Sequence, residues 1–404
     1  MNILFLHPNF PAQFKDPCIK LALDQKHQIK FICQTHYGRE LRGIEKLVLK
    51  GGGSHESIIN SNTTDVGKQL ARGRAYRFAF EQLKKQNWIP DVVVAHSGWG
   101  CGLYIKEVWP ETTFISYLEW WFDPQSELIH SLRENQYFRL SDDEVSYLWI
   151  RNMPAALEIS SADQLVTPTE WQKKQLPIAL RNRCDVVPDK IDPDTFFPNI
   201  NLLAENPVVT YGTRGMEPMR GFPEFVEILP NLLRKWPTVS VEIAGSDTVS
   251  YGGNRPKEKS WKKWALNRLK ATNLSRRVTW KGTMPLQEYA NWLKRSWCHI
   301  YVSEPFVTSW SFIEALHCHI PMVASETSAT LEFNNINPNM VTTNHKKPEN
   351  FLEAISNRIR FSSNLNYARG DKRDAKEVKN SIFCGMGGPS LAVIIADVEA
   401  ATKI

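Results

Sequence analysis

The stretch that decides the fold is YVSEPFVTSWSFIEALHCHIPMVASETSATLE, residues 301–332. It predicts a strand end, a polar turn, a helix that Ser309 or Ser311 can cap, and a buried strand at 322–324 that runs into a second polar turn. A βαβ unit of this kind binds ligands where polar groups gather at strand ends and helix starts. Glu314 lies among apolar residues near the start of the helix, so it is either a surface side chain or a ligand contact.

Length and composition favour two folded domains that bind anionic ligands. The chain has 404 residues, 42% of them apolar, which exceeds what a single hydrophobic core usually supports. Its net charge of +6 is spread along the sequence, which suits an anionic ligand and does not require nucleic acid. Seven scattered cysteines without a CxxC or zinc spacing indicate reduced thiols in a cytoplasmic protein.

The sequence contains neither a signal peptide nor an apolar run of the roughly 20 residues that a membrane span needs. We therefore expect a soluble cytoplasmic protein. The basic run 257–270, with Trp261 and Trp264, fits a solvated helix and leaves open a weak peripheral contact with the inner face of a membrane.

Predicted strands alternate with helical stretches in both halves of the chain, which indicates βαβ units and parallel sheets. We predict an N-terminal, acceptor-side Rossmann-like domain at 1–198, a linker at 199–206, a donor-binding domain at 207–385 and a C-terminal helix at 386–404 that packs on the first domain. The predicted strands are 3–6, 29–33, 91–95, 113–117, 164–169 and 184–188 in the first half, and 207–211, 239–244, 278–280, 298–302 and 322–324 in the second.

A second constellation, GTRGMEPMRGF at 212–222, follows the first strand of the second half. Arg214 and Arg220 are each followed by glycine, on a loop that precedes a helix. Arginine forks bind phosphate oxygens in pairs, glycine lets the backbone approach, and a helix N-terminus attracts an anion. This order favours a diphosphate site over a turn with solvated arginines. The chain has no GxxxxGK[ST] or GxGxxG motif, which counts against an ATPase or a dinucleotide-binding protein.

These motifs resemble the retaining GT-B glycosyltransferases of the family 4 type. The resemblance rests on Arg214-x5-Arg220, on AGSD at 244–247 and on FIEAL and PMVAS within 312–325. HPNFPAQF at 7–14, SADQLVTPTEWQ at 161–172 and VVPDKIDPDTFFP at 186–198 extend it to the N-terminal half. It implies an α/β protein with two facing Rossmann-like domains and a nucleotide-sugar cleft between them.

By this resemblance, the second domain holds the donor without a metal ion. Arg214 and Arg220 would bind the diphosphate and stabilise it as it leaves, and Glu314 would bind the ribose hydroxyls. Asp192-Pro193-Asp194 is similar to a metal-binding DxD motif, but we interpret this loop pair as structural. The donor site would be completed by small residues and backbone groups: Gly212, Gly245, Ser311, Thr327 and Ser328.

The sugar end departs from the family pattern. Phe306 stands where the family usually carries a glutamate, and Glu304 lies two residues too early unless a turn brings it round. Glu119 stands where a histidine is common. Glu119 or His96, each at a predicted strand end, would position or deprotonate an acceptor hydroxyl, although His96 can equally be structural. The other residues assigned to the sugar and acceptor cleft are Gln13, Phe306, Trp120 and Trp310.

The sequence therefore predicts a retaining glycosyltransferase that uses a nucleotide-diphosphate sugar as donor and needs no separate cofactor. The acceptor would be a saccharide or a lipid-linked saccharide in polysaccharide or glycoconjugate biosynthesis. Two alternatives stay open. One is a nucleotide-sugar 2-epimerase on the same scaffold. The other is a non-catalytic protein that binds a nucleotide or a partner. It is suggested by Phe306 in place of a glutamate, and by Ala12 in a loop that usually carries glycines in this family.

Overall fold

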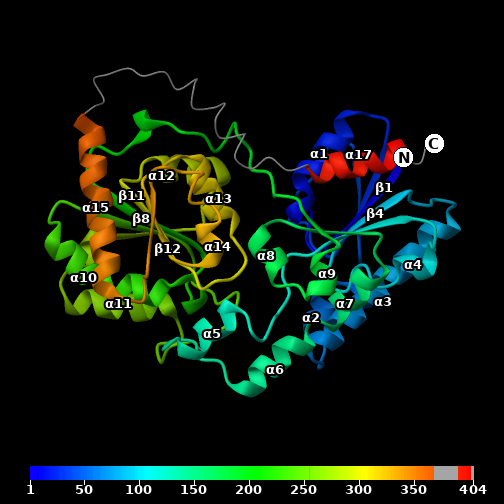
Figure 1. The fold of residues 1–404 in the computed structure, drawn as a ribbon, viewed down its shortest axis with the longest axis horizontal. Coiled ribbons are helices and arrows are strands. Elements are labelled where there is room, and N and C mark those ends of the chain that lie inside the picture. The colour runs from blue at the N-terminus through cyan, green and yellow to red at the C-terminus, as the bar shows by residue number, and fades with distance from the viewer. Residues whose placement is uncertain (254, 368–389, 402–404) are drawn as a thin grey trace. The chain divides into compact units, whose positions relative to one another are not determined.

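The computed structural model describes residues 1–253, 255–367 and 390–401, which divide into two compact units (Figure 1). The first unit contains Met1–Ser126, Asp142–Lys190 and the C-terminal helix, and the second contains Glu127–Ser141 and the described chain from residue 191 to residue 367. Each unit is a parallel β-sheet covered by helices, which confirms the predicted α/β class with two Rossmann-like domains.

The first unit has a seven-stranded sheet in the order β3-β2-β1-β4-β5-β6-β7. Successive residues of a strand point to opposite faces. Ile3 and Phe5 accordingly join a core with α1 and α17, while Leu4 and Leu6 join another with α3. The strands are β1 Asn2–Leu6, β2 Gln28–Cys33, β3 Ile44–Val48, β4 Val92–His96, β5 Thr113–Tyr117, β6 Gln164–Thr167 and β7 Cys184–Val186. The helices are α1 Lys15–Leu23, α2 His55–Ile59, α3 Asp65–Lys85, α4 Ile105–Val108, α6 Asp142–Ile150, α7 Met153–Ser161, α8 Glu170–Lys174, α9 Ile178–Arg181 and α17 Leu391–Ala401, with a 3-10 turn η1 at Ala12–Phe14.

The second unit has a six-stranded sheet in the order β10-β9-β8-β11-β12-β13. Its faces also divide the core, with Val323 on one side and Met322 and Ala324 on the other. The strands are β8 Val208–Gly215, β9 Ser240–Ser246, β10 Val278–Gly282, β11 Cys298–Tyr301, β12 Met322–Ser325 and β13 Met340–Thr343. The helices are α5 Glu127–Glu134, α10 Phe222–Lys235, α11 Trp261–Ala271, α12 Leu286–Lys294, α13 Trp310–His317, α14 Ser328–Leu331 and α15 Pro348–Tyr367, with a 3-10 turn η4 at Pro218–Arg220.

Two strands escaped the sequence prediction, β3 and β13, and both lie at the edge of their sheet. Central parallel strands are buried on both faces and appear as continuous apolar runs. β3 is mostly half-buried or exposed and carries two charges, and β13 ends in two threonines. Neither therefore shows the apolar run by which the other strands were recognised.

Two segments group with a unit that is distant from them in the sequence. Glu127–Ser141 belongs to the second unit, although the predicted first domain, 1–198, includes these residues. α17 belongs to the first unit, where it packs on α1. Among the residues that the structure describes, no helix combines the length and hydropathy required for a membrane crossing.

Candidate active site

The carboxyl ends of β8, β11, β12 and β13 meet at one edge of the second sheet, because each strand is parallel to its neighbours. Each predicted donor residue lies at the end of a strand of this sheet or in the segment that follows it. The strand order thus brings together residues that are more than 100 positions apart in the sequence.

Arg220 is the most firmly held of these residues. It ends η4, directly after β8, and is 5% exposed. Its Nη1 donates hydrogen bonds to the Oγ of Ser303 at 2.9 Å and to the hydroxyl of Tyr301 at 3.3 Å. The Tyr251 ring lies 4.8 Å from the guanidinium carbon, which adds a cation–π contact. A buried guanidinium with fixed partners is a pre-organised positive charge at the sheet edge.

Arg214 differs from Arg220 in its setting. It is the penultimate residue of β8 and is exposed. The strand therefore runs farther than predicted, so Arg214 ends a strand rather than lying on a loop. Its backbone carbonyl accepts a hydrogen bond from the Ser246 hydroxyl at 2.6 Å. The structure thus provides one buried arginine and one exposed arginine.

The two predicted glycines shape the ends of β8 and β9. Gly245 has φ +128°, and a Cβ there would lie 2.0 Å from the carbonyl oxygen of Thr213. Only glycine fits this position, because the backbones of the two strands approach so closely. Gly212 is less constrained, since a Cβ would meet the Trp292 ring at 3.4 Å, an ordinary contact.

Glu314 lies in α13, which begins after the N-cap Ser309, whose Oγ accepts from the backbone N–H of Phe312. The Glu314 carboxyl is partly buried beside Tyr289. Burial raises its pKa to about 7, against the opposing effect of the Tyr289 hydroxyl. A carboxyl poised near neutral pH suits a binding or catalytic site better than a surface helix.

The remaining predicted donor residues flank the starts of α13 and α14. The Ser311 hydroxyl is hydrogen-bonded to that of Ser309 at 2.9 Å, and Trp310 is 40% exposed. Thr327 forms a capping box for α14. The backbone N–H of Ser328 donates to a carboxylate oxygen of Glu127 at 3.3 Å, so this donor already has a protein acceptor.

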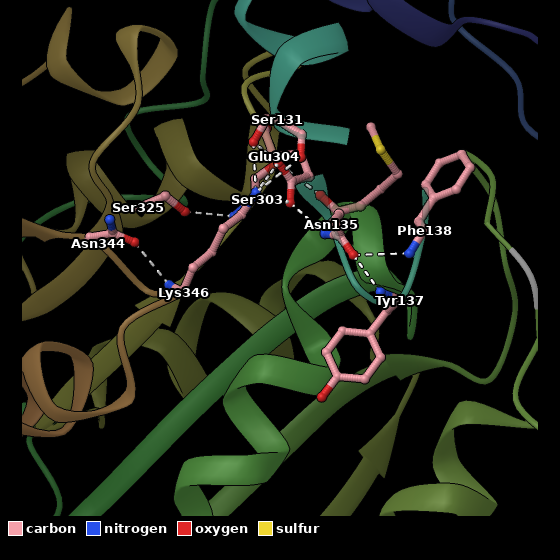
Figure 2. Close-up of polar contacts among 10 residues, drawn as sticks. Ser131, Asn135, Tyr137, Phe138, Ser303, Glu304, Ser325, Asn344 and Lys346 are labelled. Carbon is pink, nitrogen blue, oxygen red and sulfur yellow. Dashed lines mark hydrogen bonds and ion pairs between the residues drawn. The ribbon is translucent and has the colours of Figure 1, made fainter. Parts of the chain in front are cut away.

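Glu304 is enclosed by other side chains of the second unit. Its side chain is 1% exposed and is bound by Ser131, Asn135 and Lys346 (Figure 2). Phe306, at the position where the family carries a glutamate, is 9% exposed and packs edge-on against the Tyr251 ring at 5.4 Å.

Two buried carboxyls near Arg220 were not predicted. Glu217 accepts backbone hydrogen bonds from Ser250 at 2.8 Å and Tyr251 at 2.9 Å, which positions the ring that stacks on Arg220. Burial raises its pKa. Burial also raises the pKa of Glu224 to about 8. A glutamate between the two arginines of a Gly-rich loop was a signal that could have identified Glu217.

In the first unit, the ends of β1, β4 and β5 bring His7, Gln13, His96 and Glu119 together. Gln13 donates to the Glu119 carboxylate at 3.1 Å, and His96 Nε2 lies 3.5 Å from the other carboxylate oxygen. The His7 ring stands edge-on to that of His96 at 4.9 Å. Burial, reinforced by His96, lowers the pKa of His7 well below its usual value. The Glu119 carboxylate therefore lies between the Gln13 amide and the His96 ring.

Trp120 follows Glu119 in the chain, and its ring lies 6.3 Å from that of Trp171. Glu158, which was not predicted as a site residue, is fully buried in α7. Its carboxyl accepts from the backbone N–H groups of Gly98 at 3.2 Å and Gly102 at 3.0 Å, and burial raises its pKa to about 7. It therefore holds the loop that follows His96, and no sequence motif marked it.

The Asp192 carboxylate accepts hydrogen bonds from the backbone of Asp194 at 3.0 Å and from the Thr195 hydroxyl at 2.6 Å, as in a turn. Within residues 1–253, 255–367 and 390–401, no three His, Cys, Asp or Glu side chains are grouped to hold a metal ion. On the basic helix α11, Trp261 and Trp264 are buried against Tyr137 and do not face the surface.

Solved structures with the same architecture include sucrose-phosphate synthase from Thermosynechococcus elongatus, with a TM-score of 0.69 and 11% identity over 100% of this chain and 99% of that one. A glycosyltransferase from Rickettsia africae gives 0.64 and 15%, covering 100% and 98%. Anabaena HepE in complex with UDP and glucose gives 0.62 and 15%, covering 95% and 98%. At such identities the likeness shows the fold alone. A search of curated protein sequences found no match.

Two family models match the sequence directly. Residues 25–196 match the glycosyl transferase family 4 group, and residues 206–360 match the glycosyl transferases group 1. The first match falls on the half that carries His96 and Glu119, and the second on the half that carries Arg214, Arg220 and Glu314. The chain therefore belongs to the GT-B glycosyltransferases of the family 4 and group 1 type.

Proposed function

We propose that this glycosyltransferase is a metal-independent, retaining enzyme that moves a sugar from a nucleotide-diphosphate sugar to a saccharide or a lipid-linked acceptor. The reaction would serve polysaccharide or glycoconjugate biosynthesis in the cytoplasm, at the inner face of a membrane when the acceptor is lipid-linked. The observation that carries the proposal is the buried Arg220 guanidinium, held by Ser303 and Tyr301 at the carboxyl edge of the second sheet.

The chemistry of donor cleavage explains why this arginine matters. When the bond between sugar and diphosphate breaks, negative charge grows on the departing diphosphate and positive charge grows on the anomeric carbon. A guanidinium that is already oriented meets the growing negative charge with little reorganisation, so it stabilises the transition state more than the ground state. Because Arg220 and the exposed Arg214 supply this charge, the reaction has no need of a divalent cation.

We assign the other donor contacts by the same logic. Glu314 accepts hydrogen bonds from the ribose hydroxyls, most strongly in its ionised form. Small groups at the strand ends and helix starts leave room for the nucleotide: Gly212, Gly245, Ser311, Thr327 and Ser328. Phe306 and Trp310 line the sugar end.

On the acceptor side, we assign Glu119 the role of orienting the acceptor hydroxyl and His96 the role of holding that carboxylate. The hydrogen bond from Gln13 to one oxygen of Glu119 and the approach of His96 to the other support this assignment, because they place a polar group beside each oxygen. The neighbouring Trp120 contributes to the wall of the same site.

A thermal-shift and calorimetry panel over UDP-, GDP- and ADP-sugars tests the donor assignment, beginning with UDP, the nucleotide in the HepE structure. Arg220→Ala should abolish both nucleotide binding and slow donor hydrolysis, whereas Arg234→Ala, at an exposed position on α10, should retain both. Activity should survive excess chelator, and NMR should show that the product retains the donor's anomeric configuration.

The same panel distinguishes the two alternatives. Interconversion of donor sugars without any acceptor would indicate a 2-epimerase. Tight nucleotide binding with no turnover on any donor would indicate a non-catalytic protein, which the lack of a glutamate at Phe306 motivates. Loss of binding in Arg234→Ala but not in Arg220→Ala would contradict the proposed donor site.

A further inference from the structure

Three polar side chains of the segment Glu127–Ser141 are spaced four residues apart, at Glu127, Ser131 and Asn135. This spacing places them on one face of α5 and its immediate extension. All three contact residues at the carboxyl edge of the second sheet, although they are roughly 170 to 200 positions away in the sequence. The segment is therefore built into the donor-binding unit.

The centre of these contacts is Glu304 (Figure 2). One carboxylate oxygen accepts from Asn135 Nδ2 at 2.7 Å and pairs with Lys346 Nζ at 3.0 Å. The other accepts from the Ser131 hydroxyl and from Lys346 at 3.1 Å. Each oxygen thus has two protein donors, and a carboxylate that is 1% exposed has little remaining capacity for sugar hydroxyls.

The side-chain amide of Asn135 is held in one orientation by the backbone of its own segment. The Asn135 side-chain oxygen accepts from the backbone N–H groups of Tyr137 at 2.7 Å and Phe138 at 2.9 Å, so its amide nitrogen must face Glu304. The Tyr137 ring in turn packs edge-on against Trp261 and Trp264. The orientation of the Asn135 amide is therefore fixed by the fold of the segment.

A short chain of contacts connects Glu304 to the diphosphate arginine. The Glu304 backbone N–H donates to the carbonyl of Met219 at 3.0 Å, and its carbonyl accepts from the Ser303 hydroxyl at 2.8 Å. That same hydroxyl accepts from Arg220 at 2.9 Å. A displacement of Glu304 would therefore move both the turn that precedes Arg220 and the hydroxyl that orients its guanidinium.

We propose that Glu304 is a positioning residue, through which α5 holds Arg220 in place, and that it is not a ligand of the donor sugar. This proposal deepens the proposed function, because its functional consequence rests on Arg220 binding the diphosphate. It assigns to Ser131, Asn135 and Lys346 a role in donor affinity that no sequence motif marks.

The test is a double-mutant cycle on the full-length chain, read by calorimetric binding of UDP and of UDP-sugar. Glu304→Ala and Asn135→Ala should each weaken the binding of both ligands about tenfold, as expected when a charge-assisted hydrogen bond is lost. The double variant should be no weaker than Glu304→Ala alone, because the two residues act through one contact. Because Arg220 also stabilises the departing diphosphate, kcat should fall as well as KM rise, and Glu304→Gln should recover part of both, since an amide can still pair with Ser131 and Asn135.

Matched controls are Gln136→Ala and Glu134→Gln, which alter exposed side chains of the same segment and should leave binding unchanged. Unfolding curves and limited proteolysis of the segment show whether each variant is folded. The proposal is overturned if Glu304→Ala weakens UDP-sugar but not UDP, since Glu304 would then be a sugar ligand. It is also overturned if Asn135→Ala tightens binding, because α5 would then compete with the donor.

The structural contact between Glu304 and α5 and its effect on donor affinity can be refuted separately. If the wild-type chain binds no nucleoside diphosphate, the proposed function is wrong, and with it the effect on donor affinity. The same cycle can then be measured as changes in the free energy of unfolding, which tests only whether Asn135 and Glu304 stabilise the fold through their contact. Additive losses from Glu304→Ala and Asn135→Ala would refute such a contact, and coupled losses would support it.

Discussion

The sharpest consequence of the structure concerns the pH dependence of donor binding through Glu314. Burial raises the pKa of this carboxyl to about 7, and we assign donor binding to its ionised form, in which both oxygens accept and the negative charge strengthens each hydrogen bond. The apparent dissociation constant should therefore be multiplied by 1 + 10^(pKa − pH). This factor is about 11 at pH 6 and about 1.1 at pH 8, so affinity should fall roughly tenfold for each pH unit well below 7.

Tyr289 and Cys318, which interact with Glu314, do not titrate in this range. Burial raises the pKa of Tyr289 well above its usual value and that of Cys318 to about 12, so both stay neutral between pH 5.5 and 8.5. The ligand should be an intact nucleotide sugar, because a free nucleoside diphosphate carries a terminal phosphate that ionises near pH 6. Isothermal titration calorimetry across this range gives the slope directly.

Two variants test whether the pH dependence of donor binding comes from Glu314. Glu314→Gln should bind weakly at every pH and lose the slope, whereas Glu288→Gln, at an exposed position on α12, should retain the wild-type profile. A flat wild-type profile, or a Glu314→Gln variant with an unchanged slope, would refute the ribose assignment. The stability of the empty protein changes in the opposite direction. Between pH 4.5 and 7 the unfolded chain releases the Glu314 proton while the folded protein keeps it, so the free energy of unfolding falls as the pH rises.

Three further predictions concern groups that shape the two sites. Gly245→Ala should lower the unfolding free energy by about 2 kcal/mol or more in urea titrations, because its Cβ would lie 2.0 Å from the Thr213 carbonyl. Gly282→Ala, also at positive φ but with nothing within 4 Å, should cost less. Phe312→Ala should cost about 3–5 kcal/mol by the same measurement, since a fully buried ring leaves a cavity beneath α13; a loss below about 1 kcal/mol would contradict that packing. Glu158→Gln should remove a pH dependence: between pH 4.5 and 7, wild type should lose roughly 3 kcal/mol relative to the variant, because the unfolded chain releases the Glu158 proton first. Parallel pH profiles for the two proteins would show that this carboxyl is not buried as described.

The fold was largely predictable because parallel strands leave a strong local signal. Strands such as β4 and β5 are almost entirely buried, carry a core of β-branched and aromatic residues and are bounded by turns, so their position follows from the sequence alone. The edge strand β3 lacked this signal, since only one of its side chains is buried and the strand carries two charges. The predicted location of polar residues at strand ends also followed from local patterns, which is why His96 and Glu119 meet once the strand order is known.

Other parts of the candidate site depended on contacts that no local pattern encodes. The sequence shows Arg214 and Arg220 as equivalent, yet the structure buries Arg220 beneath Tyr251 and leaves Arg214 exposed. That difference arises because Glu217 fixes the loop that carries Tyr251. Burial depends on what packs over a residue, and the covering loop lies 31 residues farther along the chain from Arg220.

The amino-acid sequence by itself determined two parallel α/β domains, the arginine loop and the helix that carries Glu314, because apolar periodicity and turn chemistry are local properties. Only the tertiary structure decided that Glu304 is bound by α5, since Ser131 and Glu304 are 173 positions apart. Their contact is the result of packing Glu127–Ser141 against the second sheet. The arginine loop and the helix that carries Glu314 were thus visible in local motifs, whereas the setting of Glu304 depended on an element from the other half of the sequence.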